Sequence, residues 1–430
     1  MMRNKAAFRI GDASLCKQQM LSWANQFSIC CFMDNHQYQN KYSVYDCIAA
    51  ADAADLFLPQ NDTLSQLSSF TQQHRGNWLF GHVGYDLKNE IEELTSTHSD
   101  KVCFHPLFFF QPKTILLLRG NVLTIESSDE KPEDVYRNVI ESNFQNDVPS
   151  DKIIKLQQRI SKEEYSSMIG KIKQHILRGD CYEMNFCAEF FCEDCKINPI
   201  EIFQNLSRIS PTPFSAFYKL DDKYALCASP ERFMQKQKGR LISQPIKGTA
   251  KRILNDETLD NEAKLQLQNS GKNKAENVMI ADLVRNDMSK ICRRGSVAVS
   301  ELFGVYSYPQ VHQMISTIKG EVDENLNISD ALKALFPMGS MTGAPKKRVM
   351  QLIDEYELSK RGLYSGSIGY ISPENNWDFN VVIRTILYNK SKRYLSFQTG
   401  SAITFESDAE EEYNECLLKA EAMRKALNIG

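Results

Sequence analysis

The stretch Ser243-Gln-Pro-Ile-Lys-Gly-Thr249 is the part of the sequence around which the chain is organised. Pro245 restricts the backbone before the lysine, and Gly248 after it lets the main chain approach a ligand closely. Lys247 would be a nucleophile if the fold buried its amine and kept it neutral, which requires a lowered pKa. The alternative is an ordinary solvated loop lysine, because lysines are rarely buried without a partner. The other motifs of the chain are needed to distinguish these two interpretations.

Length and composition limit the class of protein. The chain has 430 residues, enough for one large domain or two, and a net charge of -3 that offers no basic field for nucleic acid. No apolar run approaches the ~20 residues that cross a bilayer, and the N-terminus does not resemble a signal peptide. We therefore expect a cytoplasmic protein that binds neither nucleic acid nor membrane, with its twelve cysteines reduced. Cys192-Glu-Asp-Cys195 has zinc-site spacing, but no second pair follows, so zinc is not expected.

Hydrophobic patterns and turn residues divide the chain into two parts. Residues 1–150 are expected to form an α+β subdomain that packs on a catalytic domain of residues 151–430, with a polar boundary at 127–151. The patterns predict helices at 133–144, 161–178, 276–287, 328–336 and 407–427. They predict strands at 78–86, 182–192, 224–227, 296–305, 378–388 and 393–399, and two strands within 102–118 around Gln111-Pro112. Such irregular alternation indicates an α+β fold with large sheets.

Carboxylates near apolar helix faces are candidate metal ligands. Glu276 lies one turn before Met279 and Ile280 and shares their face, so it needs a partner or a metal ion. The alternative is a glutamate in the first helical turn that complements the helix dipole. Glu412 and Glu415 are neighbours on the last helix, where close carboxylates repel unless a cation such as Mg²⁺ lies between them. Their alternative is a solvated acidic face.

Two further stretches carry groups that could bind an anion. Gly339-Ser-Met-Thr-Gly-Ala-Pro345 lacks Walker spacing but leads into a helix, whose free N–H groups attract a carboxylate. Arg384 lies within an expected strand, where it either binds a carboxylate through its two-pronged guanidinium or lies on a wet face.

Four segments together resemble the chorismate-utilising enzymes, and they occur in the order of that family: Ser229-Pro-Glu-Arg-Phe233, Pro245-Ile-Lys-Gly-Thr249, Ala275 to Asp287, and Gly339 to Lys346. Residues 361–370, 378–385 and Glu412-Tyr-Asn-Glu415 continue the resemblance, which covers roughly residues 155–427. It implies a large two-sheet β-sandwich core flanked by helices, similar to anthranilate synthase component I.

The residue at Lys247 separates members of that family. Anthranilate synthases resemble Pro-Ile-Ala-Gly-Thr there, whereas aminodeoxychorismate synthases carry the lysine that this chain has. Glu183 stands where isochorismate and salicylate synthases use a lysine base and ammonia-using relatives usually have glutamine. The resemblance therefore implies amination of chorismate by ammonia at C4, with anthranilate synthase second and a non-catalytic chorismate-binding protein third. Its implied partners are a glutamine amidotransferase subunit (component II) and a downstream aminodeoxychorismate lyase.

The resemblance also implies roles for individual residues. Lys247 would be the nucleophile, and Glu231, with a raised pKa, would be the acid for the 4-hydroxyl. His312 would be an active-site histidine or, alternatively, a core histidine. Mg²⁺ would lie between the ring carboxylate and Glu276, Glu412 and Glu415, although Asn273 replaces an acid usual nearby. The implied substrate-binding residues are Thr249, Thr342, Gly343, Ala344, Tyr364, Arg384, Gly400, Ser401 and Ala402.

Overall fold

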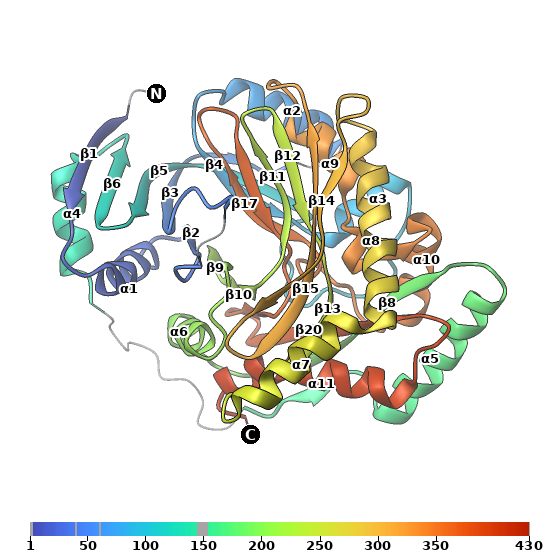
Figure 1. Cartoon of the computed structure of the whole chain (residues 1–430). Helices are drawn as coiled ribbons and strands as arrows, with labels where there is room; N and C mark the ends of the chain where they lie inside the picture. The colour runs from blue at the N-terminus through green and yellow to red at the C-terminus, as the bar shows by residue number, and fades with distance from the viewer. Residues whose placement is uncertain (1–2, 39–40, 60–61, 144–153, 430) are drawn as a thin grey trace.

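A computed structural model describes residues 3–38, 41–59, 62–143 and 154–429. Helices lie on the outside of a large body of strands (Figure 1). The helices are α1 (Ala13–Ala24), α2 (Thr63–Gln73), α3 (Lys88–Glu92), α4 (Pro132–Glu141), α5 (Lys162–Leu177), α6 (Pro199–Ile209), α7 (Glu257–Asn269), α8 (Gly271–Ser289), α9 (Ile328–Leu335), α10 (Lys346–Tyr356) and α11 (Ala409–Ala426), with the 3₁₀ turns η1 (Tyr85–Leu87) and η2 (Gly339–Met341).

Strands from the whole length of the described chain pair with one another. They are β1 (Asn4–Arg9), β2 (Ile29–Asp34), β3 (Cys47–Phe57), β4 (Leu79–Val83), β5 (Leu107–Arg119), β6 (Val122–Ser127), β7 (Gln157–Gln158), β8 (Glu183–Cys192), β9 (Phe214–Leu220), β10 (Lys223–Ser229), β11 (Arg232–Gln237), β12 (Arg240–Gln244), β13 (Ile246–Lys251), β14 (Ala298–Ser307), β15 (Val311–Glu321), β16 (Gly343–Ala344), β17 (Ser367–Ile371), β18 (Trp377–Asn380), β19 (Thr385–Asn389) and β20 (Tyr394–Ile403).

Antiparallel pairing arranges these strands in two layers that share β5. The first layer runs β1–β6–β5–β3–β2–β9–β10–β19–β20–β8. The second runs β5–β4–β17–β18–β11–β12–β15, with β13 beside β12 on one edge of β15 and β14 on the other. Large sheets flanked by helices are the α+β arrangement that the sequence predicts, and this prediction is confirmed.

Alternating side chains of the first layer contact different cores. Cys31 and Ala50 belong to a cluster that also contains Phe80, Ile368 and Phe379 of the second layer. The residues that alternate with this set along the strands point to the opposite face, as the two-residue period of a strand requires. Among them, Cys30, Ala49, Phe217 and Leu226 pack with residues of α1, α4, α6 and α11. The central strands of the first layer are therefore buried on both faces, whereas β1 at its edge is largely exposed.

The stretch expected to form two strands around Gln111-Pro112 forms one strand, β5, so that prediction is wrong. Pro112 marks the place where β5 changes partners: the residues before it pair with β4, and the residues after it pair with β6. On the other edge β3 has a register irregularity opposite this point. Proline lacks the N–H of a regular ladder and is tolerated at such irregularities, which explains why it does not end the strand.

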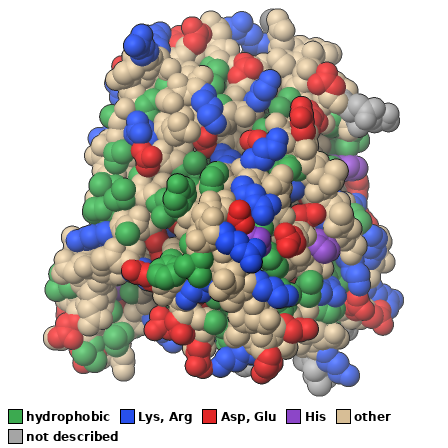
Figure 2. Space-filling view, turned by 90° about the vertical axis from the view of Figure 1, so that its right-hand side faces the viewer, with side chains coloured by type: hydrophobic (Ala, Val, Ile, Leu, Met, Phe, Trp, Pro, Cys, Tyr) green, Lys and Arg blue, Asp and Glu red, His purple; other side chains and the backbone are tan. Residues whose placement is uncertain are grey.

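The start of α5 agrees with the sequence, whereas the predicted domain boundary lies outside the described residues. A capping box of Ser161 and Glu164 begins α5, at the start of the helix predicted for 161–178. The boundary expected near residue 150 lies in 144–153, outside the described residues. On the face shown in Figure 2, basic and acidic side chains are intermixed, in keeping with the small net charge. None of the described helices combines the length and apolar character that crossing a bilayer requires.

Candidate active site

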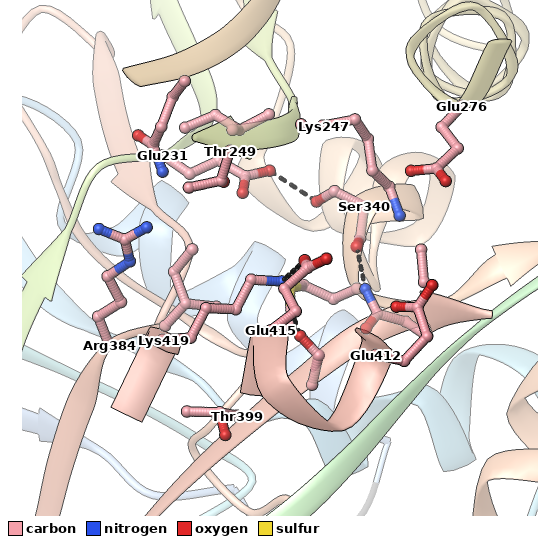
Figure 3. Close-up of a pocket in the computed structure, with 18 of the residues that line it drawn as sticks. Glu231, Lys247, Thr249, Glu276, Ser340, Arg384, Thr399, Glu412, Glu415 and Lys419 are labelled. Carbon is pink, nitrogen blue, oxygen red and sulfur yellow. Dashed lines mark hydrogen bonds and ion pairs between the residues drawn. The ribbon is translucent and has the colours of Figure 1, made fainter. Parts of the chain in front are cut away.

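A pocket opens where β13 and α8 face β20 and α11, with η2 on one wall (Figure 3). The packing of α8 on β13 and of α11 on β20 fixes these walls. The pocket brings together Glu231, Lys247, Thr249, Glu276, Tyr364, Arg384, Gly400, Ala402, Glu412 and Glu415, all of them predicted site residues. Most of the set predicted from the sequence therefore lines a single pocket, although its members are spread over nearly 190 residues of chain.

Lys247 is buried in the wall of this pocket, so the solvated-loop interpretation is wrong. The register of β13 against β15 shifts between Ile246 and Thr249, which releases the lysine from regular pairing. Its Nζ donates to Oε1 of Glu183 at 2.5 Å. Burial lowers the pKa of Lys247, but Glu183 and Glu276 outweigh it and raise the pKa above its ordinary value. Burial alone therefore does not keep the amine neutral, because the two carboxylate neighbours hold the proton on it.

Gly248 is required by the backbone on which Lys247 sits. Its φ of +95° lies in the left-handed region, and a Cβ there would come within 3.1–3.2 Å of Asn273. We expect Gly248→Ala to lower the free energy of unfolding by about 1–2 kcal/mol through backbone strain, and to reduce the activity of this site because Asn273 and Thr249 line the pocket. Urea unfolding and steady-state kinetics measure the two effects. Gly170→Ala on α5, where the added methyl meets nothing within 4 Å, is the control and should not destabilise the fold.

Glu231 lies between β10 and β11 and is buried. Ser340 Oγ donates to its Oε1 at 2.6 Å. Burial raises the pKa of Glu231 to about 7, and the hydrogen bond from Ser340 and the charge of Lys247 offset this only in part. The side chain is thus a carboxylic acid that can give up a proton near neutral pH, as the sequence analysis expected of it.

Glu276 is not in the first turn of its helix, because α8 begins at Gly271 with Ser270 as its N-cap. The dipole interpretation is therefore wrong. The carboxylate is buried, and its Oε1 has no hydrogen-bond partner. Burial raises the pKa of Glu276 to about 7, despite the opposing charge of Lys247. A buried carboxylate oxygen without a partner is the group that a cation would stabilise.

Glu412 and Glu415 face the pocket from α11, which is capped by Asp408 and begins two residues after the predicted start at 407. Glu412 is buried and accepts hydrogen bonds from Ser407 Oγ at 2.8 Å and Lys272 Nζ at 3.0 Å. Glu415 is partly exposed and pairs with Lys419 at 2.7 Å. Burial by itself raises the pKa of Glu415. Lys419 and other nearby lysines outweigh burial, so the pKa lies below its ordinary value. The solvated-face interpretation is wrong for Glu412.

The three glutamates fit a hard divalent cation only together with oxygens from elsewhere. Within the described part of the chain, no group of three or more His, Cys, Asp or Glu side chains forms a metal cluster by itself. Glu276 offers a buried oxygen without a hydrogen-bond partner. Glu412 and Glu415 lie in the same pocket and form ion pairs with Lys272 and Lys419. Mg²⁺ characteristically binds one or two carboxylates and completes its shell with substrate and water oxygens. This donor set suits that mode of binding.

Arg384 reaches the pocket because the predicted strand 378–388 is broken. Strand β18 ends at Asn380, β19 begins at Thr385, and Arg384 between them has a φ of +50°. Its guanidinium points toward the cavity (Figure 3). Burial lowers the pKa of Arg384 to about 10, so the side chain stays charged at neutral pH. It is placed to bind a substrate carboxylate.

Five predicted site residues do not line the pocket in the described structure: His312, Thr342, Gly343, Ala344 and Ser401. His312 and Ser401 point away because they alternate with Gln313, Gly400 and Ala402, whose side of the strand faces the cavity. His312 instead lies between Ser307 and Asp260, which supports the core-histidine alternative.

The Gly339–Pro345 stretch also differs from the prediction. Gly343 and Ala344 pair with β8 instead of presenting a helix N-terminus, and the Thr342 hydroxyl donates to Met338 O. Ser340 and Met341, one turn earlier, line the pocket in their place. The predicted anion site at this helix start is therefore absent from the pocket lining.

Two lysines of the pocket were not predicted from the sequence. Lys272 lies four residues before Glu276 on α8, and Lys419 lies four residues after Glu415 on α11. Residues four apart share a helix face, so this spacing could have identified both. Asn185, Gln313 and Ser340 also line the pocket, but nothing in their local sequence distinguishes them.

Comparison with known proteins assigns the family. A sequence model of the chorismate-binding enzymes matches residues 28–425. The chain belongs to this family. This chorismate-binding enzyme is 41% identical to aminodeoxychorismate synthase component 1 of Klebsiella aerogenes over 256 residues, 60% of this chain and only 56% of that protein. It is 30% identical to anthranilate synthase component 1 of Aquifex aeolicus over 371 residues, 82% of this chain and 74% of that protein.

The fold agrees with that assignment. The crystal structure of anthranilate synthase component I from Streptococcus pneumoniae matches with a TM-score of 0.76 and 24% sequence identity, over 90% of this chain and 95% of that one. The α+β fold similar to anthranilate synthase component I, which the resemblance implies, is confirmed.

Proposed function

We propose that this chorismate-binding enzyme aminates chorismate at C4 with ammonia, giving 4-amino-4-deoxychorismate for p-aminobenzoate and folate synthesis. The observation that supports this most directly is a buried lysine, Lys247, in the same pocket as the acid Glu231. The similarity to the Klebsiella protein favours the same activity. Anthranilate synthesis is the second candidate, because the Aquifex protein is similar over more of the chain.

Each proposed step uses a group in the pocket. Arg384 binds a carboxylate of chorismate, and Lys247 attacks C2 once its amine is neutral. Glu231, whose pKa is about 7, donates a proton to the 4-hydroxyl as it leaves. Ammonia then adds at C4 and expels the lysine. Bound Mg²⁺, held by Glu276, Glu412 and Glu415, would supply positive charge to the ring carboxylate. Because the enolpyruvyl group stays on, a separate lyase must complete p-aminobenzoate.

Product identification tests the proposal. The purified chain is incubated with chorismate, Mg²⁺ and ammonium, and the products are separated and weighed by mass spectrometry. The expected product keeps the enolpyruvyl group and carries one amine. Anthranilate with released pyruvate would instead establish the second candidate. No turnover, with chorismate still bound, would favour a binding protein without activity.

We expect the chain alone to use ammonium but not glutamine. The sequence contains no Gly-x-Cys-Leu-Gly motif of a glutamine amidotransferase, so a partner subunit (component II) must release ammonia. Parallel assays with ammonium or glutamine as the only nitrogen source measure this difference. Glutamine-dependent turnover by the pure chain would contradict it. We also propose a cytoplasmic location, where cysteines stay reduced.

A further inference from the structure

Glu183, the first residue of β8, contacts Lys247 and has no assigned role in the proposed reaction. It is fully buried, and its Oε1 accepts the hydrogen bond from Lys247 Nζ at 2.5 Å. Its second oxygen, Oε2, is buried without a partner. One carboxylate oxygen is thus in direct contact with the nucleophile, and the other is free to hold a proton.

Other charged groups surround this pair but make different contacts. Glu276 of α8 acts on Lys247 through its charge, as does Lys419 of α11. Glu231 receives its hydrogen bond from Ser340. Glu415 pairs with Lys419, and Lys272 with Glu412. Among the described side chains, Glu183 is therefore the base that touches the Lys247 ammonium.

We propose that Glu183 takes the proton that Lys247 must lose before it attacks chorismate, and returns it when the lysine is released. This inference rests on the proposed function, in which Lys247 is the nucleophile. A glutamine in this place could not store a proton, because its amide does not titrate. In this chain the lysine can become neutral without losing its proton to solvent.

The protons and charges balance over one turnover. Glu183 carboxylate takes a proton from the Lys247 ammonium, giving a neutral acid and a neutral amine. The amine forms a bond to C2, the C4–O bond breaks, and the hydroxyl leaves as water with the proton of Glu231. Ammonia bonds to C4 as the C2–N bond breaks and lysine leaves as a neutral amine. The new ammonium group returns a proton to Glu231, and Glu183 returns its own to Lys247.

The Glu183–Lys247 pair has a resting form, a carboxylate with an ammonium, and a reactive form, a neutral acid with a neutral amine. In the native chain the reactive form holds the same number of protons as the resting form, so its fraction does not depend on solvent pH. In Glu183→Gln the lysine must release its proton to solvent, so the reactive fraction rises about tenfold per pH unit below the pKa of Lys247. Glu231 is present in both proteins, so its titration cancels in the ratio of the two rates, whereas the pKa of Glu276, which the charge of Glu183 helps to raise, is lower in the variant.

The experiment measures the rate of chorismate–Lys247 adduct formation by quenched-flow mass spectrometry, with Mg²⁺ and without ammonia. The expected ratio of Glu183→Gln to native rates climbs about tenfold per pH unit between about pH 5 and 7. Glu183→Asp keeps an acid and should be slower at every pH, with the native profile. Glu189→Gln, which changes another buried glutamate of β8, is the control and should leave the profile unchanged.

Each outcome has a distinct meaning. A Glu183→Gln ratio that stays constant with pH would overturn the proton-transfer role while leaving Lys247 as the nucleophile. If the glutamine variant does not fold, a native-like profile in Glu183→Asp supports the role, and a profile that now rises with pH overturns it. Absence of an adduct in the native chain at every pH would overturn the proposed function itself.

Discussion

Replacing Lys247 by methionine is expected to reduce formation of the 4-amino product by at least about 10³-fold, as the loss of a nucleophile generally does. Methionine preserves the length of the side chain but cannot bond to C2. Without lysine at C2, ammonia is no longer directed to C4, and residual turnover should shift toward 2-amino products and anthranilate. The product ratio therefore changes together with the rate.

The substitution also leaves the Glu183 carboxylate buried without its cation, which typically costs about 3–5 kcal/mol. The double variant Lys247→Met/Glu183→Gln removes both charges and should recover most of that stability while remaining inactive. Lys251→Met, which changes an exposed lysine on the same strand, serves as the control and should retain activity. Near-normal formation of the 4-amino product by the Lys247 variants, with no chorismate-derived mass on the native chain, would reduce Lys247 to a binding residue.

Glu276→Gln is expected to lower Mg²⁺-dependent activity by at least about 100-fold, since even outer-shell partners of metal sites typically contribute 10–100-fold. The same substitution should stabilise the metal-free protein at neutral pH. The fold raises the pKa of Glu276 to about 7 from its ordinary 4.5. The fold thus favours the protonated acid, and the native protein loses stability relative to the glutamine variant as pH rises from about 4.5 to 7.

Urea unfolding in the absence of Mg²⁺ at several pH values measures this difference. The free energy of unfolding of Glu276→Gln minus that of the native chain should grow over that interval and then level off, by about 1.4 kcal/mol per unit of pKa shift. Added Mg²⁺ should stabilise the native chain and not the variant. Glu415→Gln should also lose Mg²⁺-dependent activity, whereas Glu411→Gln, on the exposed side of α11, should not. Unchanged activity and Mg²⁺ dependence in both pocket variants would refute the metal assignment.

Motifs predicted those site residues whose own chemistry is distinctive. A lysine between proline and glycine and a glutamate beside an apolar stripe are visible in the sequence, and both Lys247 and Glu276 line the pocket. The capped helix α5 was equally visible, because its capping box depends on residues three apart. Such features rest on local interactions, which a sequence records directly.

Features that depend on distant partners could not be predicted in this way. A motif does not say which strand residue faces the cavity, so Ser401 was predicted together with Gly400 and Ala402, although of these three residues Gly400 and Ala402 alone line the pocket. The kink at Arg384 and the passage of β5 through Pro112 depend on which strands pair with which. The raised pKa of Lys247 likewise depends on Glu183, a residue of another strand.

The pairing of β8 with β20 also determines when the active site can exist during synthesis. All ten residues of β8 are buried, yet its partner begins at Tyr394, roughly 200 residues later. At 5–20 residues per second, a ribosome needs about 10–40 s to make the intervening chain. Throughout that time an apolar strand edge is unpaired, and such edges recruit other chains. The nascent enzyme is therefore a natural client for chaperones until its last strand and helix emerge.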